Sequence, residues 1–168
     1  MKTFRILFAC LLGGVALTGC TTCPSKNCSS SGLAGAWRAK IHLTSGAYAA
    51  AKDLEFIYVF NPGGTMTESA NYDSAPPVPP AYGVWRMTGP REYEYKSVYY
   101  TTKAPAKFED LAGGGGWLPS GRGVVTEKIV IGPDGQHFES KVHYEESDAT
   151  GKKTDTGEGT GDGERIGF

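Results

Sequence analysis

The sequence Thr154-Asp-Thr-Gly-Glu-Gly-Thr-Gly-Asp-Gly-Glu-Arg-Ile166 says most about how this chain folds. From Gly157 to Glu164, glycines alternate strictly with acidic residues and one threonine. Successive side chains of a strand point to opposite faces, so the alternation predicts a strand with one polar face and one bare face. A bare face leaves room for large aromatic side chains or for a ligand. Arg165 continues that face and should point inward. The composition is also typical of a disordered acidic tail.

The chain before this stretch also has the pattern of strands. Aromatic and β-branched runs are separated by Gly, Pro and Asn, and no window spaces apolar residues at helical intervals over three turns. Phe138, Val142 and Tyr144 share one face of their run, and charged residues share the other, as in a half-buried antiparallel strand. Eight strands are expected, at 33–43, 54–60, 65–72, 82–88, 91–102, 123–131, 136–145 and 154–166, with a short helical turn within 46–52. Near-neighbour connections then predict an all-β fold, a single eight-stranded antiparallel up-and-down barrel.

The first nineteen residues have the order of a secretory signal peptide. Lys2 and Arg5 give a positive start, and a twelve-residue apolar run covers 6–17. A membrane-spanning helix needs roughly 20 apolar residues, so the run is too short to span. The tetrapeptide Leu-Thr-Gly-Cys at 17–20 resembles the lipobox of bacterial lipoproteins. That resemblance implies cleavage before Cys20 and a membrane anchor of diacylglycerol, with palmitate among its chains, on the Cys20 sulfur. An ordinary secretory signal without lipid is the alternative.

The lipoprotein resemblance also implies a place in the cell. It puts the chain in the bacterial cell envelope, and Thr21 instead of Asp after the anchor favours the outer membrane, facing the periplasm or the surface. Residues 20–32 are rich in Ser, Thr, Cys and Gly and indicate a flexible tether. Within it, Cys23 and Cys28 either form a local disulfide, as an oxidising compartment allows, or stay free thiols. The expected domains are therefore a signal peptide at 1–19, a lipidated tether at 20–32 and a barrel at 33–168.

Charge and motifs exclude several classes of function. After cleavage, 149 residues would remain, with 15 basic and 18 acidic side chains and a net charge of −3. The absence of a basic run argues against binding to nucleic acid. The sequence has three histidines and no nucleophile elbow, phosphate loop or zinc-binding His pair. We therefore expect no metal site, no cofactor and no catalytic residue that a motif would identify. The sequence leaves the oligomeric state open.

Short motifs carry a second resemblance. Leu33-Ala-Gly-Ala-Trp37 resembles the Gly-x-Trp signature that opens lipocalins and their calycin relatives. The stretches Gly64-Thr-Met-Thr-Glu68 and Tyr82-Gly-Val-Trp85 look like those of a group of secreted bacterial lipocalin-like proteins. The resemblance implies that Trp37 closes one end of the barrel. It also implies that a cation of the last strand, here Arg165, packs on the indole, a contact worth about 1 kcal/mol.

The interior of such a barrel is the expected functional site. An eight-stranded barrel is just wide enough to be filled by side chains or to hold one small ligand. Tyrosine hydroxyls in an apolar lining are typical of ligand pockets. Glu68 would be a buried carboxylate with a raised pKa if it faces inward. The predicted pocket residues are Phe56, Tyr58, Glu68, Trp85, Tyr93, Tyr95, Tyr99, Phe138 and Tyr144, with the loops at 76–80 and 113–116 at the mouth.

Three functions follow as hypotheses. The favoured one is an envelope lipoprotein that binds a small apolar or amphipathic molecule in the barrel. The second is a filled barrel that acts as an interaction or inhibitor module through its loops. The third is an enzyme of the isomerase or hydratase type, in which Glu68 handles the proton. An inward Glu68 beside tyrosine hydroxyls in a cavity would favour the enzyme, and an outward one would exclude it.

Overall fold

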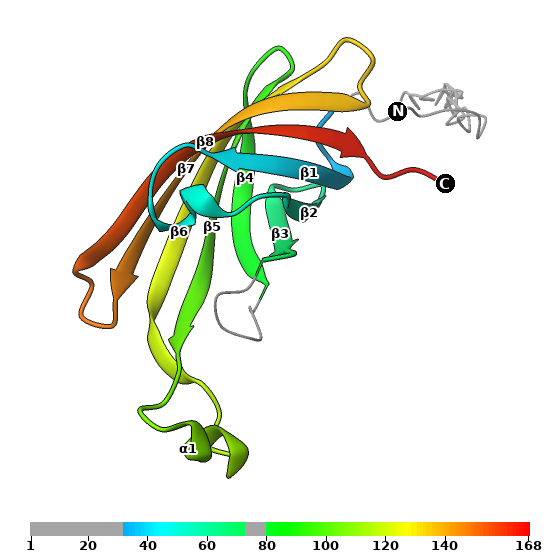
Figure 1. Ribbon diagram of the computed structural model, residues 1–168. Coiled ribbons are helices and arrows are strands. Elements are labelled where there is room, and N and C mark those ends of the chain that lie inside the picture. The colour runs from blue at the N-terminus through cyan, green and yellow to red at the C-terminus, as the bar shows by residue number, and fades with distance from the viewer. Residues whose placement is uncertain (1–31, 73–79) are drawn as a thin grey trace, which may run out of the picture.

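The computed structural model describes residues 32–72 and 80–168 and has the predicted architecture. Its eight strands close into an antiparallel barrel in sequence order, β1 to β8, and β8 pairs with β1 (Figure 1). The strands are β1 (Gly35–Leu43), β2 (Leu54–Phe60), β3 (Thr65–Ala70), β4 (Ala81–Gly89), β5 (Glu92–Lys103), β6 (Leu118–Ile131), β7 (His137–Asp148) and β8 (Lys153–Arg165). The all-β up-and-down barrel predicted from the sequence is therefore confirmed.

Several predictions fall outside the described residues. The signal peptide at 1–19, the anchor Cys20 and the cysteines Cys23 and Cys28 precede them, and most of the proline loop at 76–80 lies in the gap between them. Within 32–72 and 80–168, no helix is long and apolar enough to cross a membrane.

The two ends of the barrel differ in their connections. At one end, tight turns at 61–64, 90–91 and 132–136 join the strands, and Arg165 at the end of β8 pairs with Trp37 near the start of β1. At the other end, the longer connections carry a 3₁₀ turn, η1 (Ala47–Ala50), and a one-turn helix, α1 (Phe108–Ala112). Figure 1 shows α1 projecting well beyond that end of the barrel. We call the first end the plugged end and the second the open end.

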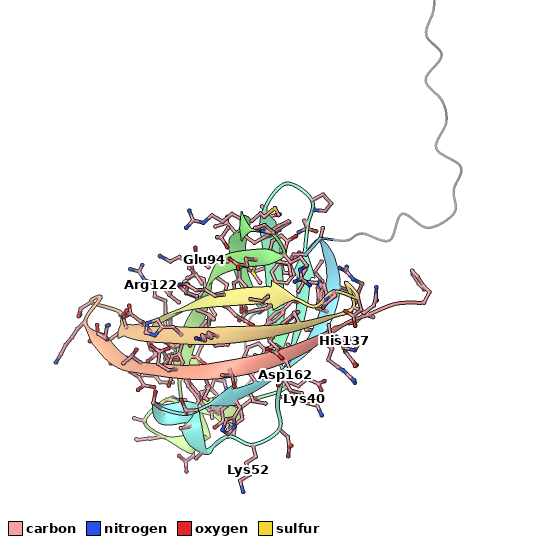
Figure 2. All side chains as sticks on the ribbon, turned by 90° about the horizontal axis from the view of Figure 1, so that it is seen from above. Lys40, Lys52, Glu94, Arg122, His137 and Asp162 are labelled. Carbon is pink, nitrogen blue, oxygen red and sulfur yellow. The ribbon has the colours of Figure 1, made fainter. Side chains whose placement is uncertain are left out.

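Period-2 alternation explains the wall of the barrel. In β7, Phe138, Ser140, Val142 and Tyr144 are buried, and the residues between them are exposed or half-buried. Figure 2 shows labelled charged side chains, among them Lys40, Arg122, His137 and Asp162, projecting from the outer surface. Charged residues thus lie on the outside of the wall, and most of the buried inward residues are aromatic or aliphatic.

The glycine-rich stretch forms β8, with its bare face inward, and it seats aromatic rings. A Cβ added at Gly163 would lie 2.2 Å from the Phe138 ring, and one at Gly157 would lie 2.3 Å from the Tyr144 ring. Such approaches are far closer than carbon atoms tolerate, so only glycine allows these rings to lie against the strand. None of the four alternating glycines lines the cavity described below. The bare face therefore makes room for side chains and not for a ligand directly.

The largest differences from the sequence prediction concern strand β6 and helix α1. Strand β6 begins at Leu118, five residues earlier than expected, because the β5–β6 ladder continues to the pair Lys103–Leu118. Pro119 and Gly121 lie in this early part, and both residue types weaken a strand pattern. Helix α1 was not predicted, because five residues are too few to show a helical period.

Candidate functional site

The plugged end is a packed core around Trp37. The indole is fully buried, and its Nε1 donates a hydrogen bond to the Leu33 carbonyl (2.8 Å). The guanidinium carbon of Arg165 lies 4.1 Å from the centre of the indole, a cation–π distance. Arg165 also donates hydrogen bonds to the carbonyl oxygens of Gly32, Ala34 and Gly135. These bonds tie the end of β8 to the start of β1 and to the β6–β7 turn.

Aromatic rings fill the rest of the plugged end. Phe138 lies 5.2 Å from Trp37, and Phe60 lies 6.1 Å from Trp85, which in turn lies 5.9 Å from Tyr93. Trp85, Tyr93 and Phe138 were predicted as pocket residues, but they do not line the cavity. Phe138 packs on Trp37, Trp85 packs on Phe60, and Tyr93 packs on Trp85, so all three belong to the ring cluster of the plugged end.

The open half of the barrel contains a cavity of about 350 Å³. Six of the nine predicted pocket residues line it, namely Phe56, Tyr58, Glu68, Tyr95, Tyr99 and Tyr144. Aliphatic side chains of β1, β2, β6 and β7 supply much of the remaining wall, including Ile41, Leu43, Leu54, Val125 and Val142. The loop at 113–116, predicted to shape the mouth, is not among the lining residues.

Two carboxylates lie between the packed end and the cavity. Glu68 on β3 lines the cavity and accepts a hydrogen bond from Ser97 Oγ at Oε2 (3.1 Å). Glu127 on β6 accepts hydrogen bonds at Oε2 from the hydroxyls of Tyr58 (2.9 Å) and Tyr95 (2.7 Å). Glu68 is 5% exposed and Glu127 is 0% exposed. We call Glu68, Ser97, Glu127 and the neighbouring Ser140 the acidic layer.

The acidic layer is electrostatically unfavourable when it is fully ionised. Burial, with a further contribution from the Glu127 charge, raises the pKa of Glu68 to about 7. Burial also raises the pKa of Glu127. The pKa values of the Tyr58 and Tyr95 hydroxyls are raised as well, by burial first and then by the charge of Glu127. Both tyrosines therefore remain protonated and act as hydrogen-bond donors to Glu127.

Two buried oxygens of the acidic layer lack hydrogen-bond partners. They are Glu127 Oε1 and Ser140 Oγ. A Cβ added at Gly161 would lie 2.5 Å from Ser140 Oγ and 3.5 Å from Glu127 Oε1, so both atoms face the same bare spot on β8. The Ser140 hydroxyl still lies near enough to Glu127 to offset part of the rise that burial causes in the pKa of this carboxyl group.

The rim of the cavity is held by tyrosine–carboxylate pairs. Glu146 Oε1 accepts hydrogen bonds from the hydroxyls of Tyr48 and Tyr99, each at 2.8 Å. Tyr144 donates a hydrogen bond to Asp155 Oδ2 (2.6 Å), and burial followed by this bond raises its pKa to about 12. Turn η1 carries Tyr48 to the open end, where its ring lies 5.4 Å from that of Tyr144.

The charged side chains in the described lining of the cavity are all acidic. Its lining includes Glu68, Glu146 and Asp148, and none of the lining residues found in the described part of the chain is Lys, Arg or His. Among the described residues, no group of three or more His, Cys, Asp or Glu is arranged to hold a metal ion.

Sequence reasoning missed several residues of the site. Glu127 had a signal, because it interrupts an otherwise apolar or bare face formed by Gly123, Val125, Ile129 and Ile131. No pattern in the sequence pointed to Glu146. The predicted strand ended at 145, and the hydrogen-bond partner of Glu146, Tyr48, lies 98 positions away in the chain. Such pairs depend on the register of the closed barrel, which the sequence does not display.

Comparisons of this chain with protein-family models, with curated proteins and with solved structures find no match. The function therefore has to be inferred from the geometry of the barrel itself.

Proposed function

We propose that this protein binds a small apolar or amphipathic molecule in the open half of its barrel. The observation that carries the proposal is the cavity of about 350 Å³, bounded below by the acidic layer and reaching the rim at Glu146. Ligand pockets have volumes of about 300–1,000 Å³ and combine an apolar lining with a few polar groups. This cavity has both properties, with Leu54 and Val125 among its apolar residues.

Burial of the ligand's apolar part would supply most of the affinity. Each CH₂ group removed from water contributes about 0.8 kcal/mol, and the cost of ordering the ligand is subtracted from that gain. The packed end of the barrel keeps the walls in place, so the site is largely preformed.

The proposal includes a lipid anchor and a lipocalin-like relationship, both inferred from sequence motifs. A lipid on Cys20 would hold the barrel in the bacterial envelope through the tether at 20–32. The contact between Arg165 and Trp37 supports the lipocalin-like relationship, because the Gly-x-Trp resemblance implies that contact. Mass spectrometry of protein extracted from membranes tests the anchor. A diacylated Cys20 is expected, and an unmodified residue 20 would contradict the anchor.

Filling the cavity tests the binding function. In Ala70→Phe, a ring is added at a half-buried residue of the lining. Binding of 1-octanol, measured by calorimetry, should weaken at least about tenfold because the site would be occupied. Thr160→Phe adds the same ring on the exposed face of β8 and should leave the affinity unchanged. Equal affinities in both variants and the parent protein would refute the proposed site.

A second candidate function is proton transfer, which the inward Glu68 favours. A carboxyl group whose pKa is about 7 can both accept and donate a proton near neutral pH, and Tyr95 lines the same cavity. The test is exchange of the α-hydrogens of 2-octanone in D₂O, followed by NMR. Catalysis predicts exchange faster than in buffer and its loss in Glu68→Gln. Equal rates in buffer, parent protein and variant would exclude this function.

A further inference from the structure

The cavity contains acidic groups that nothing in its lining neutralises. Glu68 lies at its floor, and Glu146 and Asp148 lie nearer the rim. The described lining residues include no basic side chain. Buried carboxylates in proteins are usually paired with a cation or fully hydrogen-bonded. An occupant that carries positive charge would complete this site.

The acidic layer also has unused acceptors. Glu68 is a 95%-buried carboxylate of the cavity lining, and its Oε2 accepts a hydrogen bond from Ser97 Oγ. Glu127 Oε1 and Ser140 Oγ, in the same layer but outside the cavity lining, have no hydrogen bond of good geometry. A carboxylate can accept several hydrogen bonds through its two oxygens, so Glu68 can also accept one from a ligand that brings N–H donors.

The rings around Glu68 suit a cation as well. Tyr58 and Tyr95 line the floor with their centres 5.5 Å apart, and Phe56 lies 5.9 Å from Tyr58. The faces of aromatic rings attract cations, and more strongly once water is excluded. Above this floor, the wall is formed by aliphatic residues such as Leu43, Leu54 and Val142. Charge recognition is therefore concentrated at the floor, and apolar contact lies above it.

We propose that the ligand of this cavity is a small organic cation, an ammonium group on an apolar body, with the ammonium against Glu68 and the body against the aliphatic wall. The inference rests on the proposed binding function and names its ligand class. A fatty acid fits poorly, because its carboxylate would meet Glu68 and find no basic partner in the described lining. With a neutral ligand, Glu68 would have to take up a proton or remain an uncompensated buried charge.

A series of ligands with one eight-carbon chain tests the charge preference directly. Octylammonium, 1-octanol and octanoate are titrated into the full-length protein at pH 8 by calorimetry. At this pH an alkylammonium is charged, as a lysine side chain is. The inference predicts binding of octylammonium at least about tenfold tighter than that of 1-octanol, the gain typical of a charge-assisted hydrogen bond. Octanoate should bind most weakly. This order is read from the parent protein, so it does not depend on any variant folding.

Two variants test whether the carboxylate of Glu68 is the group that binds the ammonium. Glu68→Gln keeps the shape of the side chain. It should weaken the binding of octylammonium at least about tenfold and change the affinity for 1-octanol less than about threefold. Glu139→Gln removes an equal charge from the exposed face of β7 and should change neither. If octanol and octanoate bind as tightly as octylammonium, the cation inference is overturned and the binding function stands. If none of the three binds, the binding function itself is refuted.

Discussion

The two halves of the barrel are built from the same eight strands but differ in what fills them. In the plugged half, the rings of Trp37, Phe60 and Phe138 belong to one packed aromatic core, and the guanidinium of Arg165 lies over the Trp37 ring. The open half keeps about 350 Å³ unfilled beside buried and half-buried carboxylates. The acidic layer forms the boundary between the two halves. Stability is therefore expected to depend mainly on the plugged half, and binding on the open half.

The acidic layer explains why the packing stops at this level. A buried carboxylate can be covered by apolar side chains only at a large desolvation cost, so rings cannot close over Glu68 as they close over Trp37. The hydroxyls of Tyr58 and Tyr95 bind Glu127, the hydroxyl of Ser97 binds Glu68, and Glu68 alone of the two carboxylates borders the cavity.

Removing the central ring of the plugged half should have the largest effect on stability. Trp37→Ala should lower the free energy of unfolding by about 4 kcal/mol, the cost of a large cavity in a packed core. Tyr99→Ala removes a ring that already borders the cavity and should cost less than half as much. Urea unfolding of both variants measures the difference. Equal losses would show that the two halves do not differ in packing.

The acidic layer should make stability fall as pH rises. The pKa of Glu68 is about 7 in the folded chain against an ordinary value of 4.5, so the unfolded chain loses this proton first. This contribution to stability is complete below about pH 4.5 and is lost as pH rises through 7, by up to about 3 kcal/mol. The ionisable groups that face Glu68 are Glu127 on β6 and the tyrosines Tyr58 and Tyr95 on β2 and β5.

Glu68→Gln isolates that contribution. Its unfolding free energy should exceed that of the parent protein at pH 8 and equal it near pH 4, as measured by urea unfolding at both values. Glu139→Gln, on the outer face, should follow the parent protein. A Glu68→Gln curve parallel to that of the parent protein would mean that the carboxyl group is not destabilised by burial.

A methyl group on the glycine face should disturb the plugged half more mildly. Gly163→Ala places a carbon against the buried Phe138 ring and should cost about 2 kcal/mol through overpacking. Gly167→Ala adds the same methyl group where nothing lies within 4 Å, and should change stability by less than about 0.5 kcal/mol. Thermal unfolding compares them. A Gly163→Ala protein as stable as its control would show that the ring is not seated on the strand.

The smallest expected effect concerns binding at the plugged end. Trp85 does not line the cavity, so Trp85→Phe should change the affinity for 1-octanol less than about twofold. Phe56 does line it, and Phe56→Ala should weaken binding about tenfold. Fluorescence or calorimetric titration measures both. A larger loss of affinity in Trp85→Phe than in Phe56→Ala would indicate that the ligand binds in the plugged half, which would contradict the proposed site.

The sequence predicted the architecture because the architecture depends on local patterns. Period-2 alternation in residues such as Phe138 and Val142, and the glycines at 157–163, identify strands and their inward faces without knowledge of their partners. Glu68 was recognised as a candidate on the same basis, although its direction became clear only from the closed barrel.

The division into two halves was not predictable from the sequence. Inward aromatic residues look alike in a strand, and Tyr93 and Tyr99 differ only in how far along β5 they lie. Their distance from Trp37 is set by the register and closure of eight strands. The pairing of Glu127 with Tyr58, 69 positions apart, has the same origin.

Methyl NMR during titration with 1-octanol tests the difference between the two halves most directly. The methyl signals of Leu54, Val125 and Val142, which line the cavity, should shift with ligand concentration. Those of Met66, Ile129 and Ile131, buried below the acidic layer and outside the cavity lining, should stay in place. Shifts confined to the second group, or to methyl groups on the outer wall, would contradict a ligand site in the open half.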